Sequence, residues 1–212
     1  MKKTSKSSKR WLKEHFNDPF VKKAQAEGYR SRAAYKLIEI QEKDKLIKQG
    51  MRVADLGAAP GGWAQLLVKW VGHKGHVVAM DLLAMDSIVG VDFLQGDFLE
   101  DAVLAQLTDM FKGEKLDVIV SDMAPNTSGV KETDQSRSML LCEYAMDFVQ
   151  QQLREGGSFL IKTFQGEGWD AYLKLMRQAF TKVVVRKPEA SRGRSREVYL
   201  LARGFRAENS VN

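Results

Sequence analysis

Asp55-Leu-Gly-Ala-Ala-Pro-Gly-Gly-Trp63 is the stretch that decides the fold, because it joins a short apolar run to a helical pattern. Residues 51–56 are typical of a buried strand, and residues 61–71 are typical of an amphipathic helix. Small residues between a strand and a helix let a ligand approach bare backbone at the helix N-terminus. The stretch therefore predicts a ligand site at a strand-to-helix turn, although an ordinary structural turn is the simpler alternative for this motif alone.

The ligand is expected to be S-adenosylmethionine rather than a dinucleotide. Ala59 stands where the dinucleotide fingerprint has its second glycine, and Pro60 lacks the amide that a pyrophosphate would use. Asp81 ends the next strand pattern, at a distance suited to hydrogen bonds with ribose hydroxyls. Asp97 follows the third strand pattern, where it can face an adenine amine. Either acid alone is more typical of a turn, but the two in this order favour an adenosyl ligand.

Strand and helix patterns alternate along the chain, which predicts an α/β fold with a mostly parallel sheet covered on both faces. The expected strands are 51–56, 76–81, 91–95, 116–121, 157–163, 182–186 and 197–203. The expected helices are 31–43 (capped by Ser31), 61–71, 101–111, 134–154 and 168–180. The connection 187–196 is too short for a crossover helix, so the last two strands are expected to pair antiparallel.

The positive charge lies at the N-terminus. Residues 1–32 contain 10 Lys/Arg and 3 Asp/Glu, whereas the remaining 180 residues contain 23 and 24. Aromatic residues are interleaved with these cations, a pattern that suits a phosphate backbone with unstacked bases. We therefore expect a basic arm at residues 1–30, disordered over 1–9, then one domain at 31–205 and a short tail at 206–212. The RNA-binding candidates are Lys9, Arg10, Lys22, Lys23, Arg30, Arg32, Arg192, Arg194 and Arg196.

The chain has one cysteine, three histidines and no apolar run long enough to span a membrane. No secretory signal follows the basic N-terminus, so a cytoplasmic, reduced environment is expected. No metal site, membrane association or obligate protein partner is expected, and the protein is expected to be a monomer.

Four charged residues that are distant in sequence are expected to converge at one edge of the sheet. Asp122 ends the fourth strand, and Lys162 lies inside an apolar strand beside it, where a charge needs a partner. Glu197 begins the antiparallel last strand, which places it at the same edge, and Lys36 lies on the helix before the first strand. We interpret Lys162 as the catalytic centre, acting as a base or as a cation that steers a developing alkoxide. Asp122 would orient it, Lys36 would tune the site and Glu197 would orient Lys36 or the hydroxyl group.

These four residues resemble the Lys–Asp–Lys–Glu tetrad of the FtsJ/RrmJ family of ribose 2′-O-methyltransferases. The stretch at residues 55–63 and Ser121-Asp-Met-Ala-Pro-Asn126 resemble motifs of that family as well, and the resemblance covers about residues 28–205. It implies a class I methyltransferase fold (Rossmann-like, seven-stranded, with an antiparallel last strand) that uses S-adenosylmethionine. With the turn, it gives this set of candidate cofactor-binding residues: Asp55, Gly57, Pro60, Gly61, Gly62, Trp63, Asp81, Asp97 and Asp122.

The resemblance also implies methylation of a uridine ribose in the A loop of large-subunit ribosomal RNA, during ribosome assembly. One alternative is a ribose 2′-O-methyltransferase that acts on transfer RNA or on a messenger-RNA cap. A second, of another class, is a non-catalytic RNA-binding assembly factor. A non-catalytic binder has no need of a buried group of lysines and carboxylates, which favours the enzyme.

Overall fold

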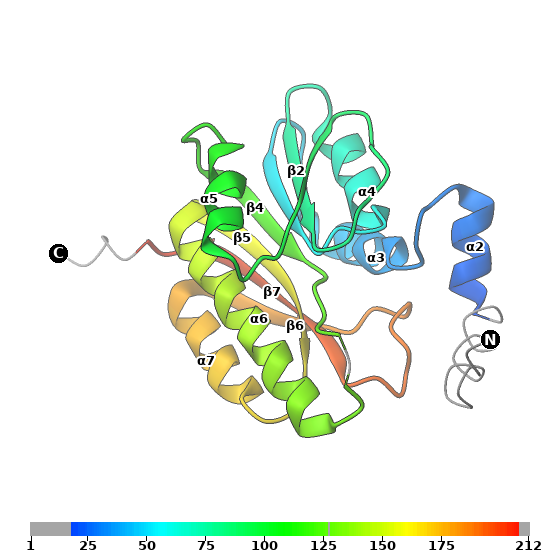
Figure 1. Ribbon diagram of the computed structural model, residues 1–212, viewed down its shortest axis with the longest axis vertical. Coiled ribbons are helices and arrows are strands. Elements are labelled where there is room, and N and C mark those ends of the chain that lie inside the picture. Colours follow the sequence, from blue (N-terminus) through cyan, green and yellow to red (C-terminus); the bar gives the residue numbers. More distant parts are fainter. Residues whose placement is uncertain (1–17, 127, 208–212) are drawn as a thin grey trace.

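A seven-stranded sheet forms the centre of the molecule, with strand order β3-β2-β1-β4-β5-β7-β6 (Figure 1). The computed structural model describes residues 18–126 and 128–207. The strands are β1 (Arg52–Leu56), β2 (His76–Asp81), β3 (Val91–Gln95), β4 (Leu116–Ser121), β5 (Leu153–Phe164), β6 (Phe180–Arg186) and β7 (Glu197–Phe205). The helices are α2 (Pro19–Glu27), α3 (Ala34–Asp44), α4 (Gly62–Val71), α5 (Asp101–Asp109), α6 (Lys131–Gln152) and α7 (Trp169–Ala179).

Strands β3, β2, β1, β4 and β5 pair in parallel, whereas β7 runs antiparallel to both β5 and β6. The chain builds outward from β1 in one direction, to β2 and β3, and then returns to the other side of β1 as β4. Ligands of open parallel sheets bind where the strand order reverses, outside the carboxyl ends of the strands. In this sheet that point lies between β1 and β4, where the Asp122 amide donates to the carbonyl of Leu56 (3.1 Å).

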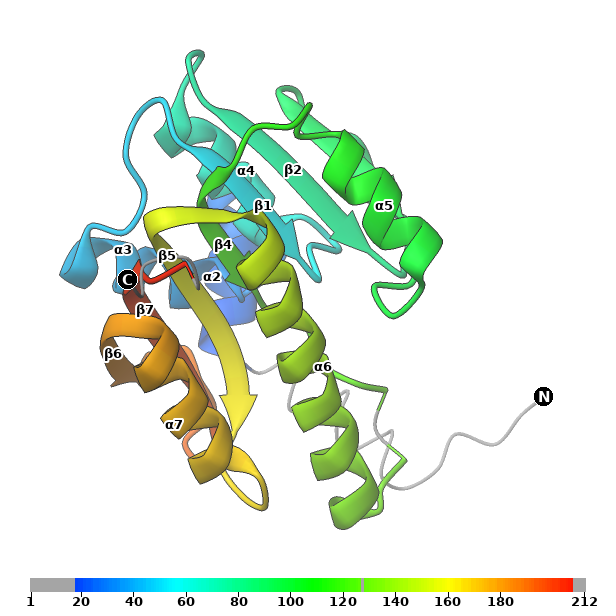
Figure 2. The same cartoon turned by 90° about the vertical axis from the view of Figure 1, so that its left-hand side faces the viewer.

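Two cores pack on opposite faces of the sheet. Alternate strand residues such as Leu56 and Phe159 pack with α5, α6 and α7, whereas their neighbours such as Val53 and Leu160 pack with α3 and α4. Figure 2 shows α5, α6 and α7 in front of the sheet, with α3 and α4 behind it. The expected α/β sheet with helices on both faces is confirmed, including the antiparallel last strand.

Some element boundaries differ from those expected. The helix expected at 134–154 is Lys131–Gln152, and the strand expected at 157–163 starts earlier, at Leu153. The prediction that Ser31 caps a helix was wrong. Its hydroxyl accepts from the amide of Ala33 (3.1 Å) in a turn that leads into α3, whereas the helix itself begins at Ala34 and its N-cap is Ala33, without a side-chain cap.

Helix α2 was not predicted, because residues 18–30 were assigned to a basic arm. Asp18 caps this helix by accepting from the amide of Phe20 (3.0 Å), and Pro19 suits its first turn. Its apolar side is held by the Phe20 ring, whose centre lies 5.6 Å from that of Tyr35 on α3. In the part of the chain that the structure describes, no helix combines the length and apolar character needed to cross a membrane.

Candidate active site

Lys162 and Asp122 form an ion pair at the carboxyl edge of the sheet. Lys162 Nζ lies 3.2 Å from Asp122 Oδ1, and it also donates a hydrogen bond to the Asp122 backbone carbonyl. The parallel pairing of β4 and β5 brings the two residues together, since Ser121 lies opposite Ile161. The side chain of Lys162 is 8% exposed and that of Asp122 is 17% exposed. Their expected proximity is confirmed, and a cation is thereby held within a mostly buried site.

Tyr199 is a member of this group that the sequence analysis missed. It is fully buried on β7, and its hydroxyl donates to Asp122 Oδ1 over 2.6 Å. Burial raises the pKa of the Asp122 carboxyl. The nearby cations of Lys162 and Lys36, together with hydrogen bonds from Tyr199 and Lys162, lower it further than burial raises it. Asp122 therefore carries a stabilised negative charge.

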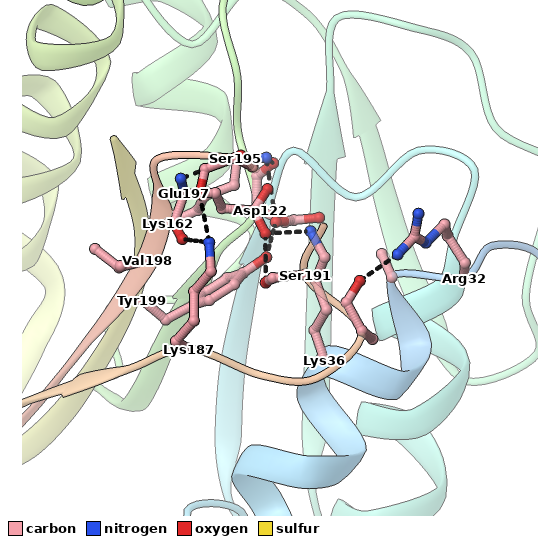
Figure 3. A network of polar contacts seen from close by, with 12 residues as sticks. Arg32, Lys36, Asp122, Lys162, Lys187, Ser191, Ser195, Glu197, Val198 and Tyr199 are labelled. Carbon is pink, nitrogen blue, oxygen red and sulfur yellow. Dashed lines mark hydrogen bonds and ion pairs between the residues drawn. The ribbon is translucent and has the colours of Figure 1, made fainter. Parts of the chain in front are cut away.

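Lys36 and Glu197 form a second ion pair beside the first, with 2.7 Å between Lys36 Nζ and Glu197 Oε1. Lys36 Nζ also lies 5.5 Å from the centre of the Tyr199 ring, so the two pairs share one aromatic wall. The Ser191 hydroxyl donates to the same Glu197 oxygen (2.8 Å), a second contact that the sequence did not indicate. Figure 3 shows Lys36, Asp122, Lys162 and Glu197 converging from α3, β4, β5 and β7.

A cavity of about 580 Å³ lies next to Asp122, where the residues that follow β1, β2, β3 and β4 meet. Gly57 lines it, and a Cβ added there would lie 2.7 Å from Met123 Cγ and 2.8 Å from the Met123 amide nitrogen. A side chain at position 57 is therefore excluded by the chain that follows β4. The cavity is lined by Gly57, Ala59, Met80, Asp81, Leu82, Leu83, Gly96, Asp97, Phe98, Leu99, Asp122, Met123, Ala124, Pro125, Asn126, Arg137, Leu140 and Leu141.

Asp81 and Asp97 present carboxylates to this cavity from the ends of β2 and β3. Asp81 accepts from the amides of Ala59 (2.9 Å) and Leu83 (2.8 Å), one at each oxygen, and Asp97 accepts from the amide of Leu99 (3.0 Å). A carboxylate oxygen has two lone-pair sites, so both acids keep acceptor capacity for a ligand. Phe98, Leu82 and Leu99 add apolar surface for a flat ring.

A family model described as FtsJ-like methyltransferase matches residues 29–205, which include all four charged residues and the cavity. The chain belongs to this family. It is 60% identical to the ribosomal RNA large subunit methyltransferase E of Pseudomonas fluorescens, over 97% of this chain and 98% of that protein. Identity is also 60% with the protein of the same name from Marinobacter nauticus, over 95% of this chain and 98% of that one.

Two solved structures agree with the family's fold. A crystal structure described as a ribosomal RNA methyltransferase, putative, from Plasmodium falciparum is 30% identical, with a TM-score of 0.75, and the match covers 84% of this chain and 98% of that chain. A fibrillarin/Nop5p complex matches at 21% identity with a TM-score of 0.56, over 83% and 82% of the two chains. The second match shows the fold alone.

Four residues of this FtsJ-like chain that were expected to bind a cofactor, Pro60, Gly61, Gly62 and Trp63, are not on the wall of the 580 Å³ cavity. A Cβ at Gly62 would lie 2.6 Å from the hydroxyl oxygen of Ser31, so this glycine packs closely against the segment before α3. The indole of Trp63 is buried, donates to the carbonyl of Ala33 (2.8 Å) and packs near Tyr199. These residues shape the turn rather than line the cavity.

Asp55 was also expected to bind the cofactor, but it does not line the cavity. Its side chain is fully buried, and neither carboxyl oxygen has a hydrogen-bond partner among the described residues. Burial raises the pKa of Asp55 well above its ordinary value, and the charges of Asp122 and Asp81 raise it further. The structure therefore favours a neutral, protonated Asp55 close to Asp122 and Asp81, which do line the cavity.

Arg30 and Arg32, both expected to bind RNA, are engaged within the protein. Arg30 donates to the carbonyls of Pro60, Asp86 and Ser87. Arg32 pairs with Asp18 and donates to the carbonyl of Ala190, which ties α2 to the loop before β7. Sequence alone shows the charge of an arginine but not the carbonyls that it meets, which explains the different assignment.

The remaining RNA-binding candidates have different surroundings. Lys22 and Lys23 are exposed on α2, and Lys23 pairs loosely with Glu27 (3.9 Å). Arg192 is half-buried and lines a second cavity of about 330 Å³, together with Arg32, Ala33, Lys36, Ala190, Ser195 and Glu197. Arg194 and Arg196 are exposed in the same loop, whereas Lys9 and Arg10 lie outside the described residues. Among the residues that the structure describes, no group of three or more His, Cys, Asp or Glu side chains could hold a metal ion.

Proposed function

We propose that this protein uses S-adenosylmethionine to methylate the 2′-oxygen of a uridine ribose in large-subunit ribosomal RNA, in the A loop, during ribosome assembly. The observation that carries the proposal is the buried Lys162–Asp122 pair, since Asp122 lines an adenosyl-sized cavity while the neighbouring Lys36–Glu197 pair lines a cation-rich one. Relatives about 60% identical along nearly their whole length are named as ribosomal RNA methyltransferases, which supports the choice of RNA.

The residues around the larger cavity fit S-adenosylmethionine. A cavity of about 580 Å³ is within the usual range for small-ligand sites. Asp81 would accept from the ribose hydroxyls and Asp97 from the adenine amine, while Phe98 and Leu99 would border the ring. Bare backbone at Gly57 and the carboxylate of Asp122 would border the methionine part. When bound, S-adenosylmethionine supplies a methyl group already activated by its sulfonium.

Lys162 is the group that we expect to act on the ribose hydroxyl. An ammonium has three N–H donors, and Lys162 uses two of them on Asp122, at Oδ1 and at the backbone oxygen. No other described residue accepts from the third donor, which we expect to meet a substrate oxygen. A 2′-hydroxyl is a poor nucleophile until it loses its proton. As the oxygen–methyl bond forms and the sulfonium–methyl bond breaks, that proton would pass to water, and a fixed cation beside the oxygen stabilises the negative charge that develops. Asp122 and Tyr199 hold this lysine in place, and we therefore favour the steering role of Lys162 over the role of base.

Lys36 and the cavity that it borders provide the RNA side of the site. Arg32, Lys36 and Arg192 line one wall, immediately beyond Glu197. Guanidinium and ammonium groups bind phosphates, and a single phosphodiester next to the target ribose would lie within reach of them. Because Glu197 pairs with Lys36, it would set the position of that cation relative to the hydroxyl group.

The test is methyl transfer to large ribosomal subunits that lack the modification, with a labelled methyl donor and mapping by alkaline hydrolysis. A 2′-O-methyl group blocks alkaline cleavage at its own nucleotide, so this assay distinguishes ribose from base methylation. We expect one protected uridine with the wild-type protein. We expect Lys162→Ala to lower the rate constant by about 100- to 10,000-fold while the donor still binds.

The matched control is Lys182→Ala, which removes a lysine of the same charge from an exposed position on β6. It should transfer methyl groups at the wild-type rate. A Lys162→Ala protein that is folded and equally active would rule out the assignment of Lys162. Label found on a base, or only on transfer RNA, would rule out the proposed substrate.

A further inference from the structure

Arg30 makes a set of contacts that the proposed chemistry does not use. Its guanidinium donates to the carbonyl of Asp86 over 2.6 Å, to that of Ser87 over 2.9 Å and to that of Pro60 over 3.3 Å. The first two carbonyls belong to the loop 82–90 between β2 and β3, and the third belongs to the turn between β1 and α4. One side chain therefore bridges the two segments that follow the first two strands.

The backbone that carries Arg30 is anchored to α4. Its amide donates to Gln65 Oε1 on α4 (2.9 Å), and Gln65 Nε2 donates to the carbonyl of Gly28 (3.2 Å). This pair of bonds anchors residues 28–30 to α4.

The loop 82–90 forms one side of the cofactor cavity. Leu82 and Leu83 line that cavity although they are 53% and 65% exposed, so little protein covers them from outside. The same loop packs on the turn, because a Cβ at Gly61 would lie 2.8 Å from Ile88 Cδ1 and 2.9 Å from Met85 Sδ. Met85 and Ile88 also pack against the buried Ala58, Ala64 and Ala79. Three hydrogen bonds from the charged Arg30 side chain add a link between the loop and the turn, beside the one that Asp81 makes.

We propose that Arg30 is a positioning residue for the cofactor cavity, which holds the loop 82–90 against the turn, rather than a contact for RNA. Asp81 immediately precedes this loop and binds the amides of Ala59 and Leu83, one on each segment. Holding the two segments together keeps Asp81 and the leucines in the arrangement that receives an adenosyl group. This inference rests on the proposed function, because S-adenosylmethionine is taken as the ligand.

The geometry requires arginine specifically. A planar guanidinium has five N–H donors in a fixed fork, and those on two nitrogens point at three carbonyl oxygens here. A lysine keeps the charge but offers a single nitrogen, which cannot meet both segments with the same geometry. A role that depends only on charge, such as attraction of a phosphate, would be kept by lysine.

The test compares Arg30→Ala and Arg30→Lys with the wild-type protein in two binding assays. The first is titration calorimetry with S-adenosylhomocysteine, the unreactive product, and the second is binding of a ribosomal RNA fragment at several salt concentrations. The control is Lys69→Ala, which removes an exposed cation from α4. Circular dichroism and a thermal scan check that each variant is folded.

We expect Arg30→Ala to bind S-adenosylhomocysteine about tenfold more weakly, the loss of roughly one charge-assisted hydrogen bond. Arg30→Lys should recover only part of this loss, and RNA affinity and its salt dependence should match those of Lys69→Ala. Weaker RNA binding with full rescue by lysine, or unchanged binding of the nucleoside in Arg30→Ala, would overturn the inference. If the wild-type protein binds no S-adenosylhomocysteine, the proposed function itself fails.

Discussion

The substitution Tyr199→Phe removes one hydroxyl group from the centre of the charged network and leaves the ring in place. That hydroxyl donates to Asp122 Oδ1 at 2.6 Å, and Tyr199 is fully buried. Hydrogen bonds to charged groups contribute about 1.5–3 kcal/mol. Because Asp122 is 17% exposed, water compensates part of the loss, and we expect the lower part of this range. At 2–4 °C per kcal/mol for a chain of roughly this size, about 1.5 kcal/mol lowers the Tm by about 3–6 °C.

The same bond gives the loss of stability a pH dependence. The folded-state pKa of Asp122 is lowered, because the cations and hydrogen bonds outweigh its burial. A lowered carboxyl pKa contributes stability that is present above the unfolded value of about 3.9 and is lost as the pH falls through the folded value. Tyr199→Phe removes one of the causes of the lowered pKa. The difference in unfolding free energy between the two proteins should therefore be largest above about pH 5 and should shrink towards pH 3.

The assay is urea unfolding followed by circular dichroism at several pH values, together with methyl-transfer rates at neutral pH. We expect a fall of about tenfold in the rate, because Asp122 would orient Lys162 less well, with little change in binding of the methyl donor. Equal stability of the two proteins at neutral pH would refute the argument. So would a difference that stays constant from neutral pH down to pH 3.

Two further predictions follow from the cavity and from the acid beneath it. Gly57→Ala should weaken binding of the methyl donor by at least about tenfold and destabilise the protein by about 1–3 kcal/mol, because φ is +80° and the new Cβ meets Met123. Gly50→Ala is its control, since φ is also +80° but nothing lies within 4 Å of the new Cβ; equal donor binding in both variants would contradict the argument. Asp55→Asn should gain stability relative to the wild-type protein as the pH rises above about 4. The reason is that the carboxyl pKa is raised in the folded state, so above that pH the unfolded wild-type chain ionises Asp55 more readily than the folded one. Urea unfolding at pH 5 and pH 8 checks this, and a gain that does not grow with pH would show that Asp55 is not held neutral.

Much of the site could be predicted from sequence because the ends of parallel strands lie at the same edge of a sheet. Asp122 and Lys162 are recognisable as charges at the end of, or inside, apolar strands, and parallel neighbours place such residues at the same edge. Glu197 follows from the same argument once the last strand is seen to be antiparallel. Tyr199 and Ser191 could not be found in this way. An aromatic residue in an apolar strand is indistinguishable from core, and the Ser191 contact depends on the path of an irregular loop.

The sequence alone determined the order of the strands and of the helices after residue 30, the edge of the sheet where the chemistry gathers, and the four charged residues that meet there. These depend on hydrophobic periodicity and on the lengths of the connections between strands, both of which can be read along the chain. Only the tertiary structure decided which polar groups face the cavity and which satisfy the protein itself. Arg30, Trp63 and Asp55 all carried a plausible ligand-binding role, yet each is buried or bonded within the fold. The physical reason is that the partner of a side chain depends on distances between segments that are far apart in sequence. The sequence gives the charge of each residue, but it does not give those distances.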